Sequence, residues 1–453
     1  MLPEGKGFIK GFDWGLYPEA ENFLRTEVSR FLKNNVFAKN LSVKMKTYTS
    51  THFFDWIDHI ILPQERVRGI KKLGFEYIGI DGTDVFKHTK TVFFPVVIGE
   101  RDFIEIVLKP EDIEHFTKKF GGRIEGERFA PYRKAAIRRQ GKYILSAAER
   151  RGYNGFAVHE VNDVDAYKKS LKIFAERRRK FPSDKKGLDA TQKLVESRMK
   201  KLSPARAADA FFRNERTYWQ GRNHAGRIQK ARQDKLGLGW GNHDHHTYRS
   251  SRKNFRQLIE IFERFGYVCR ERFFAGEAAG WGAQILEHPV CDIVLFADVD
   301  ITKNEKDMDF AHSGLANRKN LGTVGLWIGL HGESILQAGL HHLEARFDFE
   351  RLRKDLPRQG ANMMNPFSYF EFLKQAFTEG EYWTVDKKRL DALLKRGSIT
   401  RDQYNNFLKH GAIGSHMENL QRTQGFKGFN QDSVTAILKA TDPRKHMQPH
   451  RYA

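Results

Sequence analysis

The stretch NHDHHTYRS (242–250) has a counterpart later in the chain, LHHLEARF (340–347). In each stretch a histidine is followed four residues later by an arginine, which gives the pairs His245–Arg249 and His342–Arg346. If both stretches are strands, the two-residue alternation of side chains puts each pair on one face, about 13 Å apart along the strand.

Each of these stretches runs directly into a segment with helical spacing of apolar residues, FRQLIEIFERFG (255–266) and FERLRKDLPRQG (349–360). Two strand–helix units that each offer an imidazole and a guanidinium would suit a metal site that also holds an anionic substrate. The same spacing also fits solvated or core-capping histidines on two amphipathic helices. The spacing alone leaves both interpretations open.

Composition bounds the class of protein. The chain has 453 residues, of which 40% are hydrophobic and 13% aromatic, so it can bury a sizeable core in two or more domains. A net charge of +22 is compatible with nucleic-acid, anionic-membrane or acidic-metabolite partners. Cys269 and Cys291 are too few for a disulfide framework, and we expect no structural zinc site. With no signal-peptide pattern and no apolar run of about 18 residues, we expect a cytoplasmic protein without a membrane partner.

The strand and helix patterns repeat along the chain. Residues 1–120 are predicted to form a β-α-β-β-β module, and residues 239–305 a second one that ends in DIVLFADVD. Residues 306–453 are predicted to form a closing copy, interrupted by helices over NPFSYFEFLKQAF (365–377) and over 387–411. This plan predicts an α+β fold of repeated modules with large helical insertions.

Residues 121–238 differ in character because basic residues dominate them. A basic helix is expected after GGRIEGERF, up to Arg139, and further basic helices over 166–181 and 186–232. This segment is predicted to be a surface for a polyanion or nucleic acid. A solvated helical linker with charged faces is the alternative, because no zinc-finger or RNA-recognition signature accompanies the helices.

Two histidines and one carboxylate on inward strand faces form a facial triad, which leaves three metal positions open. Fe(II) is the usual metal in such a site, and Mn(II) or Co(II) could also occupy it. Spacing alone does not choose among the candidate carboxylates, which are Glu287, Asp298, Asp300 and Glu418.

The modules resemble the vicinal oxygen chelate superfamily, in which β-α-β-β-β units form a half-open barrel around one metal. More narrowly, residues 242–440 resemble the iron-dependent 2-oxoadipate dioxygenase/decarboxylase family. The resemblance rests on His245 with Arg249, on FGYVCRERF, on HHLEAR with His342, and on MENLQR. The tail QGFKGFNQDSVTAIL is similar to the closing segment of that family and of 4-hydroxyphenylpyruvate dioxygenase.

This resemblance implies that His245, His342 and Glu418 hold Fe(II), and that Glu418 is preferred to Asp298. It implies oxidative decarboxylation of a 2-oxo acid such as 2-oxoadipate, with dioxygen, to a hydroxy acid. Arg249 would hold a substrate carboxylate, and Gln284 and Arg346 would be further donors in the pocket. The first module departs from the pattern, since Pro63 stands four residues after His59 where an arginine is expected. We expect that module to be metal-free, and a ligand role for His59 is the alternative. The basic segment 121–238 has no counterpart in the family.

Overall fold

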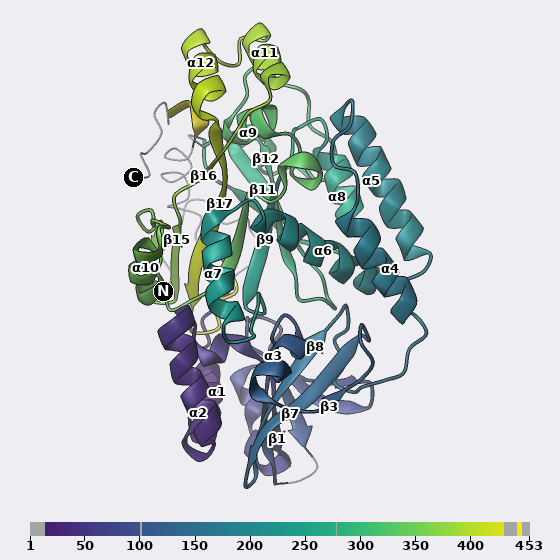
Figure 1. Cartoon of the computed structure of the whole chain (residues 1–453), viewed down its shortest axis with the longest axis vertical. Coiled ribbons are helices and arrows are strands. Elements are labelled where there is room, and N and C mark those ends of the chain that lie inside the picture. The colour runs from purple at the N-terminus through teal and green to yellow at the C-terminus, as the bar shows by residue number, and fades with distance from the viewer. Residues whose placement is uncertain (1–13, 100–101, 278, 430–441, 446–453) are drawn as a thin grey trace.

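The computed structural model describes residues 14–99, 102–277, 279–429 and 442–445. Two mixed β-sheets lie one beyond the other along the long axis of the molecule (Figure 1). The first is built from the N-terminal third of the chain and the second from the C-terminal half. Most of the predicted tail 424–438 lies outside the described residues, which end at 429 in that region.

The first sheet has the strand order β2-β3-β4-β1-β5-β8-β7-β6. Its strands are β1 (Ile57–Pro63), β2 (Glu76–Ile80), β3 (Thr83–Lys87), β4 (Val96–Gly99), β5 (Ile104–Leu108), β6 (Ile124–Glu125), β7 (Tyr132–Gln140) and β8 (Tyr143–Arg150). Strand β1 pairs in parallel with β4, and β5 in parallel with β8, while β1 and β5 are antiparallel. The sheet is therefore two β-α-β-β-β modules side by side, with 3-10 turns in place of the first helix and α3 (Ile113–Phe120) as the second.

The predicted basic helix up to Arg139 is wrong, because this stretch forms β6 and β7. Ala135 and Ile137, two residues apart, are buried in the core of the first sheet, whereas Ala136 and Arg138 are exposed. That alternation is the signature of a strand. The density of basic residues hid it in the sequence. Helices α1 (Pro18–Asn34) and α2 (Val36–Lys44) complete this core.

The second sheet has the order β10-β11-β12-β9-β13-β17-β15-β14, with β16 on the side of β17. Its strands are β9 (His243–Arg249), β10 (Val268–Phe274), β11 (Trp281–Glu287), β12 (Val294–Asp300), β13 (His342–Arg346), β14 (Ser368–Tyr369), β15 (Leu373–Phe377), β16 (Glu381–Trp383) and β17 (Ala412–Arg422). The predicted strands and the helices that follow them, α8 (Phe255–Arg264) and α10 (Phe349–Asp355), are confirmed.

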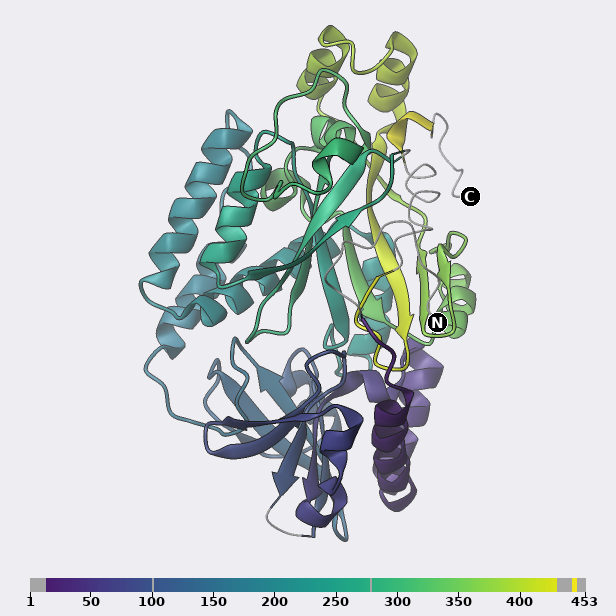
Figure 2. The same ribbon diagram turned by 180° about the vertical axis from the view of Figure 1, so that it is seen from behind.

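This sheet also consists of two modules, with β9 parallel to β12, β13 parallel to β17, and β9 antiparallel to β13. It curls into a half-open barrel (Figure 2). The predicted α+β fold class of repeated modules with helical insertions is confirmed. The helix predicted over 365–377 is wrong, because β14 and β15 supply the strands that the last module needs.

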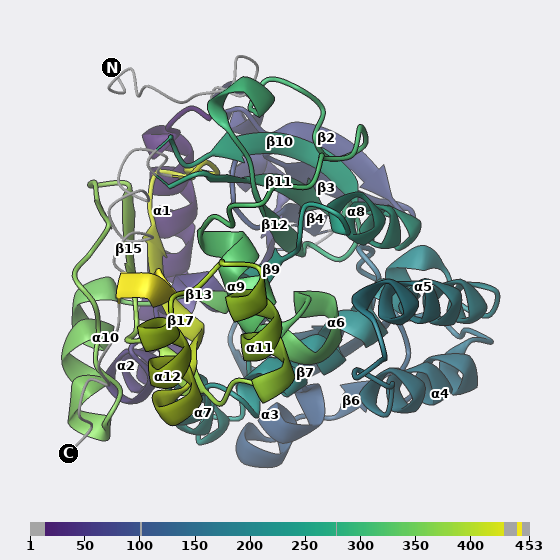
Figure 3. The ribbon, with the colours of Figure 1, turned by 90° about the horizontal axis from the view of Figure 1, so that it is seen from above.

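Helical insertions surround the second sheet. Helices α4 (Val164–Ala175), α5 (Asp184–Met199), α6 (Pro204–Gln220) and α7 (His224–Asp234) share one apolar core with strands β9, β12 and β13. Helices α9 (Thr323–His331), α11 (Lys387–Lys395) and α12 (Arg401–His410) stand together at one end of the molecule (Figure 3). Within the described residues, none of the helices has the length and apolarity that crossing a bilayer requires.

Candidate metal centre

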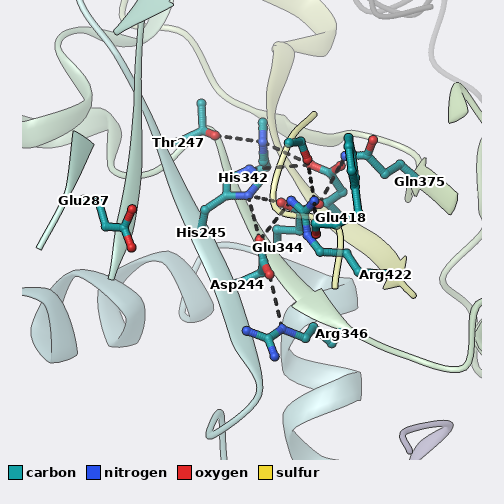
Figure 4. A network of polar contacts seen from close by, with 12 residues as sticks. Asp244, His245, Thr247, Glu287, His342, Glu344, Arg346, Gln375, Glu418 and Arg422 are labelled. Carbon is teal, nitrogen blue, oxygen red and sulfur yellow. Dashed lines mark hydrogen bonds and ion pairs between the residues drawn. The ribbon is translucent and has the colours of Figure 1, made fainter. Parts of the chain in front are cut away.

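Three adjacent strands bring the two predicted histidines and one carboxylate together. Strands β9, β13 and β17 are neighbours in the sheet, and they carry His245, His342 and Glu418 respectively. These side chains project toward one another from the same face of the sheet (Figure 4). All three residues are buried, and their candidate ligand atoms lie within 4.8 Å of one another.

The ring nitrogens of both histidines point at one carboxylate oxygen. His342 Nε2 lies 3.2 Å from Glu418 Oε2, and His245 Nε2 lies 3.9 Å from the same atom. Metal–ligand bonds of about 2.1 Å that meet at right angles place ligand atoms about 3 Å apart. The observed separations are close to that spacing, so the three side chains fit one divalent ion.

The ligand atoms are held by neighbouring polar groups. His245 Nδ1 contacts Glu344 Oε2, and Asp244 Oδ1 lies 3.5 Å from the same nitrogen. Gln375 Nε2 donates to Glu418 Oε1 at 2.9 Å, and His341 Nδ1 lies 3.0 Å from the far nitrogen of His342, Nδ1. The Thr247 hydroxyl lies 2.8 Å from His342 Nε2, the candidate ligand atom, so a metal bond would replace that contact. A carboxylate on the far nitrogen of a ligand imidazole fixes its tautomer and orientation, which is a usual feature of metal sites.

The protonation states also suit a cation. Burial lowers the pKa of His245 and of His342 to about 3, so both imidazoles are neutral and keep a lone pair for a ligand bond. Burial raises the pKa of Glu418 to about 7, because the ionised form lacks enough compensating charge. A divalent ion would supply that charge. The chemistry of the donor set therefore fits the metal implied by the sequence.

The other carboxylates weighed from the sequence have different partners. Asp300 accepts hydrogen bonds from the backbone N–H groups of Gly322, Val324 and Gly325 at the start of α9. Glu287 pairs with Arg270 and Lys427, away from the histidines (Figure 4). Asp298 lines the pocket but faces Arg249. Of the four, Glu418 is the one that lies between the histidines.

Arg249 lines the same pocket as the three candidate ligands. Its Nε lies 3.7 Å from Asp298 Oδ2, beyond hydrogen-bond distance. Within the part of the chain that the structure describes, Nε and Nη2 of this buried arginine have no hydrogen-bond partner. Burial lowers the pKa of Arg249 to about 10, so it remains a cation at neutral pH. A buried guanidinium with unused donors is suited to a carboxylate ligand.

The two further donors expected from the sequence lie elsewhere. Gln284 is wrong as a pocket residue, because its Nε2 donates to the backbone carbonyls of Glu271 and Ile285 at 2.9 and 3.0 Å. It lies opposite Ala297, on the helix-covered face of the sheet. Arg346 pairs with Asp244, with Nε 3.2 Å from Oδ2. Its side chain lines a different and larger cavity, of about 550 Å³, between the two sheets.

The pocket around the candidate ligands is aromatic. Six rings line it: Phe273, Trp281, Phe296, Phe367, Phe377 and Phe429. Among the described residues that line this pocket, Arg249 is the one permanently charged cation. An occupant would therefore meet one guanidinium and a largely apolar wall.

Sequence reasoning missed Glu344, Thr247 and Gln375. Glu344 stands two residues after His342 on β13, and Thr247 two residues after His245 on β9. Two-residue alternation alone would have placed both on the ligand face. Gln375 was out of reach, because its segment was predicted as a helix.

Much of the basic character of α4–α7 is internal. Buried arginines there pair with acids, including Arg177 with Glu215 at 2.8 Å and Arg206 with Asp163 at 2.9 Å. Lysines on the outer faces of α4 and α5, such as Lys168 on α4 and Lys185 on α5, are exposed. Binding of a polyanion or nucleic acid by residues 121–238 stays a prediction. The exposed lysines on the outer helix faces would form that surface.

No family model matches the chain, and a search of curated proteins finds no similar sequence. Among solved structures, a putative hydrolase from Shewanella frigidimarina NCIMB 400 is 14% identical, with a TM-score of 0.30, over 54% of this chain and 96% of its own. A variant of 4-hydroxymandelate synthase from Streptomyces coelicolor is 11% identical, with a TM-score of 0.29, over 88% of this chain and 99% of its own. A methylmalonyl-CoA epimerase from Mycobacterium tuberculosis is 11% identical, with a TM-score of 0.22, over 40% and 89%. None of these likenesses decides what this chain does.

Proposed function

We propose that this chain is a non-haem Fe(II)-dependent dioxygenase that converts a 2-oxo acid and dioxygen to a hydroxy acid with loss of CO2. One observation carries the proposal. Two neutral imidazoles and a carboxylate converge within 4.8 Å in a pocket that also holds a buried arginine with unused donors. A facial triad with open positions and an adjacent guanidinium matches the needs of a chelating anionic substrate.

In this proposal His245, His342 and Glu418 hold the metal, and Mn(II) or Co(II) could replace iron in the same donor set. When bound, Fe(II) would supply Lewis acidity and the one-electron chemistry that dioxygen requires. Glu344 keeps the imidazole of His245 oriented through its Nδ1. Gln375 holds the second oxygen of Glu418, which limits how that carboxylate can turn.

Arg249 binds the substrate carboxylate in this proposal. Its side chain is held by the strand that also carries His245, four residues away on the same face. The guanidinium lies over the ring of Trp327, with Cζ 5.4 Å from the ring centroid, which restricts its orientation. The guanidinium of Arg249 and the candidate metal site therefore lie at a fixed distance from each other. An acid with two binding groups can contact both at once.

The pocket wall bears on which 2-oxo acid is used. 2-Oxoadipate carries two carboxylates, and the proposed site offers two cations for them, the divalent ion for the 2-oxo carboxylate and Arg249 for the distal one. The six aromatic rings would enclose the carbon chain between the two ends. We therefore expect a dicarboxylic 2-oxo acid such as 2-oxoadipate to be a better substrate than phenylpyruvate, which would leave the buried guanidinium unpaired.

Oxygen uptake by the anaerobically iron-loaded protein tests the proposal, with CO2 release followed in parallel. The panel contains 2-oxoadipate, 2-oxoglutarate, a branched aliphatic 2-oxo acid and phenylpyruvate. Coupled uptake of O2 and release of CO2 that is lost in His245→Ala supports the dioxygenase. The absence of turnover on every acid, with the iron site filled, overturns the proposed reaction. Preference for phenylpyruvate over 2-oxoadipate would overturn the substrate class alone.

A further inference from the structure

A second group of metal-type side chains lies outside the pocket of the candidate centre. Glu263 is in the last turn of α8, Cys269 is the second residue of β10, and His312 lies in the loop between β12 and α9. The carboxylate, thiol and imidazole atoms of these residues lie within 4.8 Å of one another. Three different segments of the chain therefore present three different ligand types to one point.

The separations are close to those a tetrahedral ion imposes. His312 Nε2 lies 2.8 Å from Glu263 Oε1, and Cys269 Sγ lies 3.8 Å from the same oxygen. Bonds of about 2.0–2.1 Å to nitrogen and oxygen and about 2.3 Å to sulfur place tetrahedral N and O about 3.3 Å apart and S and O about 3.6 Å apart. Each observed distance is within about half an ångström of these values.

The histidine is held in place from both sides of its ring. His312 Nδ1 lies 2.7 Å from Asp309 Oδ2, so Nε2 is directed at Glu263. Phe310 and Ala311, just before it, are fully buried in the core of the second sheet and anchor the loop. A carboxylate on the far nitrogen of an exposed histidine is the arrangement that orients imidazole ligands in metal sites.

The turn that joins the other two residues is equally fixed. Gly266 has φ of 91°, a conformation that favours glycine, and its N–H donates to the Glu263 carbonyl at 2.9 Å. This turn brings the end of α8 directly beside the start of β10, with Glu263 and Cys269 on the same side. His312 is exposed and Glu263 is half-buried, so an ion and a water ligand can reach the site from solvent.

We propose that Cys269, His312 and Glu263 bind a zinc-type divalent ion, with water in the fourth position. A thiolate, an imidazole and a carboxylate suit a borderline-soft ion, whereas Mg²⁺ and Ca²⁺ prefer oxygen ligands alone. The ion fastens the loop between β12 and α9 to the α8–β10 turn. The site is separate from the His245–His342–Glu418 centre and does not depend on the proposed dioxygenase reaction.

Titration with Co²⁺ alone distinguishes this site from the first, because a thiolate ligand adds a near-ultraviolet charge-transfer band that histidine and carboxylate ligands do not produce. The metal-free full-length protein is titrated with Co²⁺ and then with Zn²⁺ as competitor. We expect the band in the wild type and its retention in His245→Ala. We expect its loss in Cys269→Ser and at least tenfold weaker binding in His312→Ala.

Cys291→Ser is the matched control, since Cys291 is the other cysteine of the chain and should leave the band unchanged. The proposal is overturned if the wild type shows no thiolate band at saturating Co²⁺. It is also overturned if the band follows Cys291 or disappears with His245. In the first case the cluster is a surface ion pair of His312 with Glu263 and Asp309.

Discussion

The two sheets share one plan of strands but differ in the side chains on their inner faces. Strands β1, β5 and β8 are paired in the same sense as β9, β13 and β17. In the first sheet Ile60 pairs with Ile106, and the equivalent pair in the second sheet is His246 with Leu343. This register aligns the sheets residue by residue.

In that alignment the first sheet has the same residue type at one of the three candidate ligand positions. The positions of His245, His342 and Glu418 are held there, in the same order, by His59, Glu105 and Ser146. His59 Nδ1 lies 2.7 Å from Asp58 Oδ2, and Glu105 Oε1 lies 2.7 Å from Lys134 Nζ. Within the part of the chain that the structure describes, His59 belongs to no group of three converging metal-type side chains. This backbone is therefore compatible with either inner face, and three side chains distinguish the sheet with a candidate metal centre from the sheet without one.

The largest expected effect separates the two equivalent histidines. Changing His245 to Ala should reduce bound iron from about one per chain to a small fraction, because the two remaining ligands hold an ion poorly. The same change at His59 should leave the metal content unaltered. Metal analysis of both purified variants after iron loading makes the measurement. Equal iron content in the two variants would contradict the ligand assignment.

Arg249 marks the next difference, since Pro63 occupies the corresponding position of the first sheet. Arg249→Ala should raise KM for the 2-oxo acid about ten- to a hundredfold, because a charged hydrogen bond contributes about 1.5–3 kcal/mol. Steady-state oxygen uptake measures this. Arg346→Ala is the control, because Arg346 lines the other cavity. The KM of this variant should stay near that of the wild type. A similar rise in both variants would place the substrate carboxylate elsewhere.

Glu344 orients His245, and Val107 stands at its position in the first sheet. Glu344→Gln should weaken metal binding about 10- to 100-fold, because the imidazole loses its charged acceptor while the three ligands remain. A competition titration with a chelator gives the affinity. Glu105→Gln, at the His342 position of the first sheet, is the matched control and should bind metal normally. Unchanged affinity in Glu344→Gln would remove Glu344 from the site.

The smallest expected effect is a pH dependence of substrate binding. Burial raises the pKa of Asp298 to about 7, and this carboxyl faces Arg249. Below that pH the carboxyl is neutral and leaves the guanidinium free for substrate. Above it the carboxylate competes, so KM should rise severalfold as pH increases through 7. Asp298→Asn should flatten the profile, and a profile that keeps its slope in this variant would assign the titration to another group.

Local patterns in the sequence were sufficient for some elements and misleading for others. The strands around His245 and His342 and the helices after them were predicted because apolar spacing and turn residues agreed there. Strand β7 was mistaken for a helix, since Arg and Lys side chains masked a short alternation. Strand β15 was mistaken for a helix as well, since a dense run of aromatic residues fits either period.

The sequence by itself determined the repeated modules, the two histidines and the arginine four residues after each, because alternation along a strand is a local property. Spacing along the chain left four carboxylates open, and the tertiary structure places Glu418 between the histidines. It does so because β13 pairs with β17, which brings together Glu344 and Glu418, 74 residues apart in the chain. It also decided that Gln284 lies on the far face and that Arg346 belongs to a different cavity. Those outcomes depend on strand order and register across the sheet, which are set by the packing of distant segments rather than by neighbours in the chain.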